Sequence, residues 1–460
     1  MKTVIAALLG VVLWFCPSPE GVLPEAWHLF AIFSATVSAV VVDALPVGLA
    51  TLMGLTISVA TQTLSFEMAF SGYSNSVVWL ILAAFFIAHG FIKSGLGMRI
   101  AYFFIASMGK NTLGLGYGLA LSEFLLAPAI PSATARSGAI VYPITRSLAD
   151  AFNSYPGDKS SRRVGSYLAL VAFQSTIICS GMFLTAMAAN PMAAKLALEV
   201  GAEISWSTWT LYAIVPGLCS LMLMPWLVYR LSPPELKQTP EAVLFAKERL
   251  RHLGPLSRNE RLMLTTFVGL LIFWIFEKTF HVQPVVTALL GLSFLVLTGV
   301  LKWSDLVSLG GAGETFIWFG AFVALASGLN QLGLTTWFGK TVAALFYGFP
   351  LGVSLLGLLL IYFYIHYFFA SSTAHVGALY LPFVMVAVNL GAPPLITALV
   401  FGFMSNLYGG LTHYGFGSAP IWFGAGYVPL KEWWRVGFCM SVVNLIVWLS
   451  VGYVWWSVLS

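Results

Sequence analysis

Two short polar stretches, each set inside long apolar segments, carry residue types that could bind an anion. The first, PSATARSGAIVYP, begins at Pro131, and the second, ASSTAHVGALYLP, begins at Ala370. Each combines serine and threonine hydroxyls with small neighbours and one basic side chain, Arg136 or His375. Hydroxyls, cationic side chains and the N–H groups at a helix N-terminus are donors with which proteins hold carboxylates. The pattern therefore predicts two related anion-binding loops.

The composition places these loops in a membrane. Of the 460 residues, 59% are hydrophobic and only 8% are charged, whereas a typical soluble domain has about 25% charged residues. Apolar runs of roughly 20 residues, long enough to cross the hydrocarbon core, recur along the chain. A β-barrel is excluded because its strands would alternate apolar and polar residues. The four cysteines lack the spacing of a metal site or a disulfide framework, so we expect no metal cofactor.

Hydropathy predicts eleven transmembrane helices and two interrupted segments. The predicted spans are 3–16, 27–42, 45–61, 75–93, 165–190, 208–229, 261–279, 284–301, 313–330, 393–415 and 436–456. The stretches at about 114–148 and 350–390 contain Ser, Thr, Ala and Gly in their middle, which favours two short limbs with a break between them. We interpret both as re-entrant hairpins, with the two polar loops at their tips.

Basic residues predict the orientation, because cytoplasmic loops are enriched in Lys and Arg. The segment from Arg230 to Arg261 holds seven of them and is expected in the cytoplasm. Counting spans outward places the N-terminus in the cytoplasm as well. The net charge of +5 then reflects orientation rather than an acidic partner. The sequence opens directly on an apolar segment, so we expect a multi-pass protein of a plasma membrane, such as a bacterial inner membrane.

An internal repeat relates the two halves of the chain. Landmarks recur at offsets of 238 or 239 residues over more than a hundred positions: Pro46 and Pro284, Trp79 and Trp318, Thr134 and Thr373, Gly138 and Gly377, and Pro143 and Pro382. Each copy contains five spans and one hairpin, and an odd number of spans inverts the second copy in the membrane. Inverted repeats with broken helices at matching positions are typical of secondary transporters, with the substrate site at the repeat interface.

The hairpin tips predict what such a site would bind. A helix that begins near mid-membrane directs its N–H groups and the positive end of its dipole toward an anion. The candidate ligands are Ser132, Ala133 and Thr134 in the first copy and Ser371, Ser372 and Thr373 in the second. Small residues of this kind also serve helix packing, but two runs in register favour a binding site. Two opposed tips suit a substrate with a carboxylate at each end.

Arg136 and His375 occupy matching places beside the tips. An arginine at mid-membrane costs about 2.5–3.5 kcal/mol, so Arg136 needs a partner or water. Two interpretations stay open, a direct substrate contact and an ion pair with Glu123 in the opposite limb. A lone histidine is usually packed and hydrogen-bonded, but the symmetric position of His375 favours a side chain that faces the ligand.

Each copy has a second polar interruption downstream of its hairpin. Candidate ligands there are Ser180, Gly181 and Thr185 in the first copy and Asn406, Thr412 and His413 in the second. Unwound turns at these places would face the hairpin tips. The glycines could instead allow helix packing, and His413 could instead make a hydrogen bond between helices. Both alternatives stay open.

The chain resembles the divalent anion:sodium symporter (DASS) family over nearly its whole length. The family has a Ser-Asn-Thr motif at each hairpin tip, and the corresponding triplets here are Ser132-Ala133-Thr134 and Ser371-Ser372-Thr373, without either asparagine. The long motif SNLYGGLTHYGFGSAPIWFGAGYVPLKEWWRVG, which begins at Ser405, is similar to one branch. That branch contains plastid 2-oxoglutarate/malate translocators and bacterial citrate/succinate and tartrate/succinate exchangers.

The resemblance implies a homodimeric elevator transporter without an organic cofactor. Residues 1–109 and 261–349 would form the scaffold, 110–229 and 350–460 the transport domain, and 230–260 a cytoplasmic loop. Sodium-coupled members would hold Na⁺ near the positions of Ser132, Ala133, Gly181, Ser371, Ser372 and Gly410. The missing asparagines, together with Arg136 and a protonatable His375 as counter-charge in place of Na⁺, favour sodium-independent exchange. The expected substrates are C4/C5 dicarboxylates of the 2-oxoglutarate, malate or succinate type, with citrate or tartrate as further candidates. The alternative is a sodium-coupled symporter of dicarboxylate or sulfate.

Other functional classes find no support in the sequence. It has no HExxH motif, no acidic metal cluster and no credible Ser/His/Asp set, so we do not expect an enzyme. Repeats around one central site argue for alternating access rather than a channel. The expected partners are small dicarboxylates, lipid and a second copy of the chain, and not nucleic acid.

Overall fold

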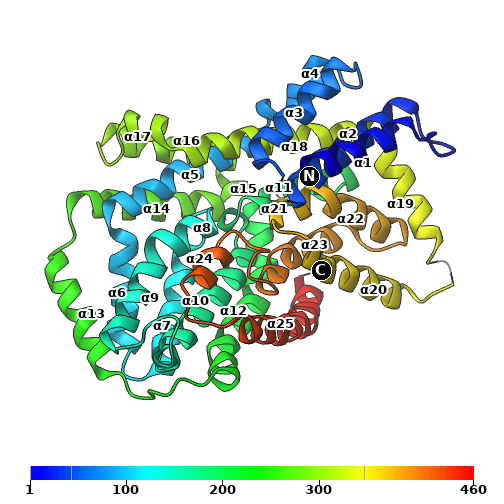
Figure 1. Ribbon diagram of the computed structural model, residues 1–460. Helices are drawn as coiled ribbons and strands as arrows, with labels where there is room; N and C mark the ends of the chain where they lie inside the picture. Colours follow the sequence, from blue (N-terminus) through cyan, green and yellow to red (C-terminus); the bar gives the residue numbers. More distant parts are fainter. Residues whose placement is uncertain (1, 43, 347, 460) are drawn as a thin grey trace. The chain divides into compact units, whose positions relative to one another are not determined.

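The chain is helical throughout the part that the structure describes. The computed structural model describes residues 2–42, 44–346 and 348–459, and these contain helices and turns with one isolated bridge between Asn111 and Gln238 (Figure 1). Eight of the described helices are long and apolar enough to cross a membrane. The prediction of an all-helical membrane protein is thus confirmed.

Helices occupy all eleven predicted spans. Their bounds are α1 (Lys2–Phe15), α2 (Pro24–Val41), α3 (Val47–Ala60), α5 (Ser76–Ser94), α10 (Gly165–Met182), α12 (Trp206–Leu231), α14 (Arg258–Ile275), α16 (Pro284–Leu297), α18 (Gly310–Gln331), α23 (Pro394–Leu407) and α25 (Leu430–Leu459). Two helices end well before the predicted spans do, because α10 and α23 stop within the polar interruptions. Ser180, Gly181 and Asn406, which were expected in unwound turns, lie in the last helical turns instead. The count of eleven crossings stays a prediction.

The break predicted in each interrupted stretch is present. In the first, α7 (Thr112–Leu126) is followed by an irregular segment and then by α8 (Ala133–Arg136), a π-helical turn (Ser137–Val141) and α9 (Tyr142–Ala151). In the second, α20 (Leu351–Tyr364) is followed by α21 (Ser372–His375), a π-helical turn (Val376–Tyr380) and α22 (Leu381–Asn389). Each element after the break begins 239 residues after its counterpart.

The π-helical turns have a cause in the sequence. Pro143 and Pro382 stand at the second position of α9 and α22, where they cannot donate a backbone hydrogen bond. The helix adjusts ahead of the first proline by a wider turn, in which the N–H of Tyr142 reaches back to the carbonyl of Ser137. The shared proline thus gives both hairpins the same local distortion.

Other local features repeat as well. Gly95 and Gly333 adopt left-handed conformations with φ of 81° and 83°, and each immediately precedes a helix, α6 (Leu96–Met108) or α19 (Leu334–Ala344). A side chain other than glycine would be strained there. The sequence repeat is therefore also a repeat of backbone structure, whereas the inverted orientation of the copies stays a prediction.

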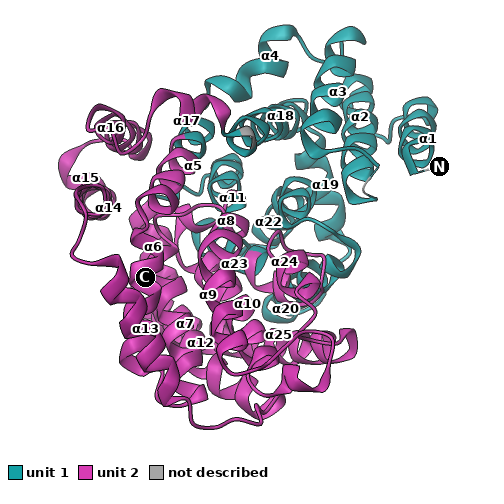
Figure 2. Ribbon diagram, turned by 60° about the vertical axis from the view of Figure 1, so that its left-hand side comes forward, with its two compact units in different colours: residues 1–82, 189–205, 309–405 teal, residues 83–188, 206–308, 406–460 magenta. Residues whose placement is uncertain are grey.

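The helices form two compact units, each assembled from three parts of the chain (Figure 2). Unit 1 contains residues 1–82, 189–205 and 309–405, and unit 2 contains residues 83–188, 206–308 and 406–460. In unit 1, a Cβ added to Gly72 would lie 1.9 Å from the carbonyl oxygen of Gly320, so α18 meets the turn before α5 backbone to backbone. In unit 2, every residue of α10 is buried.

The remaining short helices are α4 (Phe66–Phe70), α11 (Ala189–Ala197), α13 (Pro240–Leu253), α15 (Glu277–Phe280), α17 (Trp303–Ser308) and α24 (Ala419–Gly424). Of these, α13 lies within the predicted polar loop 230–260, which is ordered rather than loose. The loop is joined to the start of the first hairpin by backbone hydrogen bonds from Thr239 to Lys110 (2.9 Å) and from Thr112 to Lys237 (3.1 Å).

An ion pair closes the far end of this loop within unit 2. Arg99 donates to Glu260 (2.6 Å) and to the carbonyl oxygen of Gly254 (2.9 Å). Glu260 also completes a capping box with Ser257 at the start of α14. Burial alone would raise the pKa of Glu260, but the hydrogen bonds from Arg99 and Ser257 outweigh it and lower the pKa below its usual 4.5.

We expect Arg99→Ala to lower the unfolding free energy of the detergent-solubilised protein by roughly 2–3 kcal/mol, because a charged hydrogen-bond network is lost. The exposed Arg258→Ala, in the same segment, is the matched control and should change it by less than about 0.5 kcal/mol. Because the folded pKa of Glu260 is depressed, its contribution is present above about pH 4.5 and is lost as pH falls further. Equal unfolding curves for wild type and Arg99→Ala at pH 7 would contradict this assignment.

Candidate functional site

The first hairpin tip presents a helix N-terminus and an accessible hydroxyl. Ser132 is the N-cap of α8, where its hydroxyl accepts a hydrogen bond from the N–H of Ala135 (3.1 Å). The first N–H groups of a helix have no acceptor within it, so this end can receive an anion. Thr134, two residues into the tip, is exposed.

The backbone of Gly417, which has no side chain, lies beside the hydroxyl of Thr134. A Cβ added to Gly417, an exposed residue of the second downstream interruption, would lie 2.5 Å from Thr134 Oγ1. Only glycine leaves room for the hydroxyl there. The tip of the first hairpin and the interruption before α24 therefore meet within unit 2.

Arg136 lies behind the tip, and its side chain is fully buried. Its Nε donates to Glu123 of α7 at 2.5 Å, and its two Nη groups donate to the carbonyl oxygens of Ile130 (2.8 Å) and Ala186 (3.2 Å) and to the hydroxyl of Ser180 (3.0 Å). The sequence left open whether Arg136 contacts the substrate or pairs with Glu123, and the structure shows the ion pair with Glu123. The guanidinium thus joins both limbs of the hairpin, the break between them and the end of α10.

Glu123 has partners besides Arg136. Thr176 of α10 donates to its second carboxylate oxygen (2.9 Å), and the hydroxyls of Thr176 and Ser137 lie 3.0 Å apart. Both members of the ion pair are therefore hydrogen-bonded in the interior, which is the condition under which a buried charge pair is tolerated. Because Glu123 balances Arg136, the pair as a whole adds no net charge to the tip.

The polar residues after α10 support the same hairpin. Ser180 accepts from Arg136, and Thr185 donates to the carbonyl oxygen of Pro128 in the break (2.7 Å) while it accepts from Trp206 (3.1 Å). The carbonyl oxygen of Gly181 accepts from Trp209 (3.0 Å). The structure thus assigns protein partners to all three predicted ligands, and their roles in substrate binding stay predictions.

The second hairpin tip, in unit 1, repeats the cap. Ser371 accepts from the N–H of Ala374 (3.3 Å), Ser372 is buried, and Thr373 is half-buried. His375 is fully buried, with its Nδ1 3.0 Å from the Nδ1 of His366. The ring of His375 also packs at 4.6 Å against Tyr362 of α20. His366 was missed by the sequence analysis, although it is a polar residue in the apolar run IYFYIHYFF.

The two hairpins use equivalent positions for different chemistry. Glu123 and Tyr362 are 239 residues apart, as are Arg136 and His375, so the ion pair of the first copy is replaced by an aromatic contact in the second. Thr176 binds Glu123, and Ser405 of the following helix in the second copy lies 2.7 Å from the hydroxyl of Tyr362. In each hairpin, one residue from each limb and one hydroxyl from the following helix thus form a connected group.

The second downstream interruption is also visible in the backbone. After α23 the chain makes one 3₁₀ turn and then lacks regular structure up to Ser418. Asn406 is fully buried, and the hydroxyl of Thr412 accepts from the N–H of Gly415 (2.8 Å). His413 accepts from Trp434 of α25 (3.2 Å), so the hydrogen bond that the sequence left as an alternative is present, although it joins an irregular segment rather than a second helix to α25. The binding roles of these residues stay predictions.

Gln174 is a further polar residue that the sequence analysis passed over. It lies in the middle of α10 with only 2% of its surface exposed, and its amide approaches the carbonyl oxygen of Gly410 at 3.5 Å. The Oε1 atom of Gln174 would lie 2.9 Å from a Cβ added to Gly410, so the side chain packs directly against this glycine. This Oε1 atom accepts no hydrogen bond within the described part of the chain. The sequence could have pointed to Gln174, because it is a single glutamine inside an otherwise largely apolar helix.

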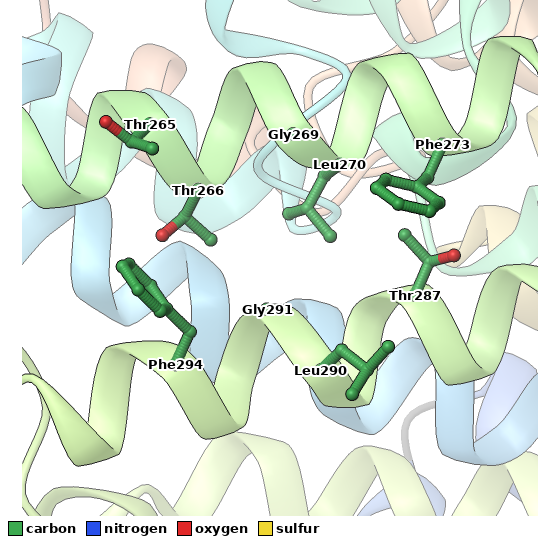
Figure 3. Close-up of a pocket in the computed structure, with 9 residues that line it drawn as sticks. All are labelled: Thr265, Thr266, Gly269, Leu270, Phe273, Thr287, Leu290, Gly291 and Phe294. Atoms are coloured by element: carbon green, nitrogen blue, oxygen red, sulfur yellow. The ribbon is translucent and has the colours of Figure 1, made fainter.

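A cavity elsewhere in unit 2 has a different character. It has a volume of about 200 Å³ and lies between α14 and α16, where Thr266 and Leu270 point toward Thr287 and Phe294 (Figure 3). None of its nine lining residues is charged. An anion would find no counter-charge there, so this cavity does not suit a dicarboxylate.

Comparisons with known proteins identify the family. The model of the sodium:sulfate symporter transmembrane region matches residues 1–460. The chain belongs to this family, the divalent anion:sodium symporters. Members of the DASS family are membrane transporters rather than enzymes. The resemblance seen in the hairpin and downstream motifs is thus confirmed over the full length.

Three DASS relatives cover nearly all of the chain. It is 48% identical to "Dicarboxylate transporter 1, chloroplastic" of Spinacia oleracea, over 100% of this chain and 82% of that protein. It is also 48% identical to "Putative malate transporter YflS" of Bacillus subtilis, over 99% and 96%. Identity to "L-tartrate/succinate antiporter" of Escherichia coli is 34%, over 96% and 95%.

A solved transporter structure shares the fold of this DASS protein. The YdaH transporter of Alcanivorax borkumensis superposes with a TM-score of 0.58 at 13% identity, over 99% of this chain and 97% of that one. At this identity the likeness concerns the fold alone.

We expect Glu123→Gln to lower the unfolding free energy by about 3–5 kcal/mol, because Arg136 would remain buried without its counter-charge. The double variant Glu123→Gln with Arg136→Met should recover only part of that loss, because the carbonyl oxygens of Ile130 and Ala186 would still lack their donor. Tyr362→Phe, at the equivalent place in the second hairpin, is the matched control and should cost only about 1 kcal/mol, because it removes a neutral hydrogen bond. The measurement is chemical unfolding in detergent. Equal losses for Glu123→Gln and Tyr362→Phe would show that the ion pair has no special role.

Proposed function

We propose that the protein exchanges C4/C5 dicarboxylates of the 2-oxoglutarate, malate or succinate type across the membrane, without sodium. The observation that carries the proposal is the pair of hairpin tips, each an N-capped helix start with an adjacent threonine, in a chain 48% identical to proteins named as dicarboxylate and malate transporters. Each tip would hold one carboxylate, through helix N–H groups and the hydroxyls of Thr134 and Thr373.

Two features support the proposed absence of sodium coupling, the chemistry of the tips and the charge balance of exchange. The asparagines of the family motif are replaced by Ala133 and Ser372, so each tip lacks an amide oxygen that could coordinate a cation. When one dianion crosses in exchange for another, the loaded carrier has the same charge in both directions and needs no co-ion. The name of the E. coli relative, an antiporter, agrees with this mode.

A sodium-coupled symporter of dicarboxylate or sulfate is the second candidate. It is favoured by the family name, since the model that matches the whole chain describes sodium:sulfate symporters. In that case Na⁺ would lie near Ser132, Ala133, Gly181, Ser371, Ser372 and Gly410. The two candidates differ in whether a sodium gradient can drive uptake into empty vesicles.

The proposal includes an elevator mechanism in a homodimer. Residues 110–229 and 350–460 would carry the substrate as a transport domain, and residues 1–109 and 261–349 would form the scaffold at the dimer interface. Two copies of one hairpin design, offset by 239 residues, support an inverted repeat with the substrate between its halves. The N-terminus and the loop 230–260 would then face the cytoplasm.

Counterflow in proteoliposomes distinguishes exchange from symport. Vesicles preloaded with unlabelled malate should take up labelled succinate at equal rates in sodium and in potassium medium, whereas empty vesicles should take up little. Competition by 2-oxoglutarate, malate, fumarate, tartrate, citrate and sulfate would then rank the substrates. Uptake into empty vesicles driven by an inward sodium gradient would overturn the exchange proposal in favour of the symporter.

Thr134→Val and Thr373→Val should each weaken dicarboxylate binding by roughly five- to 150-fold, because an unpaired carboxylate oxygen costs about 1–3 kcal/mol. The measurement is the concentration of succinate that gives half-maximal exchange. Thr56→Val and Thr265→Val, both exposed threonines away from the tips, control for the loss of a hydroxyl as such. Wild-type affinity in both tip variants would place the substrate elsewhere.

A further inference from the structure

Three cation–π contacts gather in one stretch of unit 2. Arg230 lies over the ring of Trp226 (5.3 Å), Lys237 over Tyr229 (4.7 Å) and Arg249 over Phe245 (5.0 Å). They are the cation–π contacts found among the described residues, and all lie between the end of α12 and the end of α13. Aromatic rings beside Lys and Arg are typical of the level where lipid headgroups meet the hydrocarbon.

Helix α13 has two different faces. Its buried face consists of Ala242 and Ala246, and Phe245 packs against Tyr102 of α6 at 6.2 Å between ring centroids. On the other side Leu244 is 67% exposed. Lys247 and Arg251, three and seven residues later, lie on that same side of a helix. Glu241 and Glu248 lie three residues before and four residues after Leu244, so they share this side with the two cations. An exposed leucine among charged side chains is typical of a helix that lies at a membrane surface.

More basic residues are brought to the same segment by backbone hydrogen bonds. Glu235 and Leu236 donate to the carbonyl oxygens of Arg162 (3.0 Å) and Arg163 (3.1 Å). Thr239 donates to the carbonyl oxygen of Lys110 in the same way (2.9 Å). The carboxylates of Glu235, Glu241 and Glu248 offset only part of this positive charge. The basic surface is therefore built from three separate parts of the chain and held in place.

We propose that α13 and the end of α12 form a binding surface for the headgroups of anionic phospholipids. The chemistry that fits is a phosphate diester at the membrane surface, held by Lys247 and Arg251 while Leu244 enters the outer hydrocarbon. Arg249, exposed on the side of Phe245, adds positive charge beside them. An acidic soluble partner would use the charges but would leave Leu244 in water. Lipid accounts for both the basic and the apolar part of the surface.

The test follows a fluorophore at position 244 of the full-length protein in vesicles. Leu244→Cys is labelled with bimane in a background where Cys16, Cys219 and Cys439 are serine, since Cys179 is buried. The vesicles contain brominated phosphatidylcholine as quencher and an increasing fraction of phosphatidylglycerol. We expect quenching that increases with phosphatidylglycerol and decreases at high salt. The triple variant Lys247→Gln, Arg249→Gln, Arg251→Gln should weaken the response by up to about fivefold for each neutralised charge.

A second triple variant, Lys195→Gln, Lys278→Gln, Lys340→Gln, removes the same charge elsewhere and should respond like the labelled parent. Quenching that is independent of phosphatidylglycerol, or equal in both triple variants, would overturn the proposal. A label that stays in water at every lipid composition would also overturn it and would favour an acidic soluble partner. Succinate exchange measured in the same vesicles reports on the proposed function separately, because quenching does not depend on transport.

Discussion

The buried ion pair between Arg136 and Glu123 makes the first hairpin possible. An irregular segment inside a membrane protein leaves backbone carbonyls without helical partners, and such backbone is tolerated only where the protein supplies donors. The guanidinium does so for Ile130 in the break and for Ala186 beyond α10, while Glu123 neutralises its charge. Arg136 therefore has two structural roles: it donates hydrogen bonds to carbonyl oxygens that lack helical partners, and through Glu123 it connects the two limbs.

The second hairpin reaches a similar architecture with uncharged groups. Tyr362 and His375 replace the ion pair, and Ser405 replaces Thr176 as the hydroxyl from the following helix. Hydrogen bonds to charged groups contribute about 1.5–3 kcal/mol, against about 0.5–1.5 kcal/mol for neutral ones. The first hairpin should therefore be held more firmly than the second.

The positions of the long apolar helices could be predicted from sequence, because lipid requires long apolar runs and internally bonded backbone. The shorter helices α6 and α19 fall outside the predicted spans. The two breaks were also visible, since polar residues and a proline recur at one offset, whereas the re-entrant course of the hairpins stays a prediction. The partner of Arg136 could not be chosen, because a substrate and Glu123 are equally good acceptors for a guanidinium. Ser180 and Thr185 show the same limit: polar residues in an apolar helix predict a partner of some kind, and only packing shows that theirs are Arg136 and Pro128. Helix α13 was missed because its exposed charges resemble those of a loop.

A neutral ion pair behind the first tip also bears on why exchange would be obligatory in the proposed transporter. With Arg136 balanced by Glu123, the positive potential at each tip comes from its helix N-terminus, equivalent to about half an elementary charge. In the proposed function, each such end, with the hydroxyl of Thr134 or Thr373, would hold one carboxylate of a dianion. When the site is empty, the same N–H and hydroxyl groups lose their acceptors, and each costs about 1–3 kcal/mol if it crosses the membrane interior unsatisfied. The empty carrier would thus cross far more slowly than the loaded one, so that each outward dianion requires an inward one without any coupling ion.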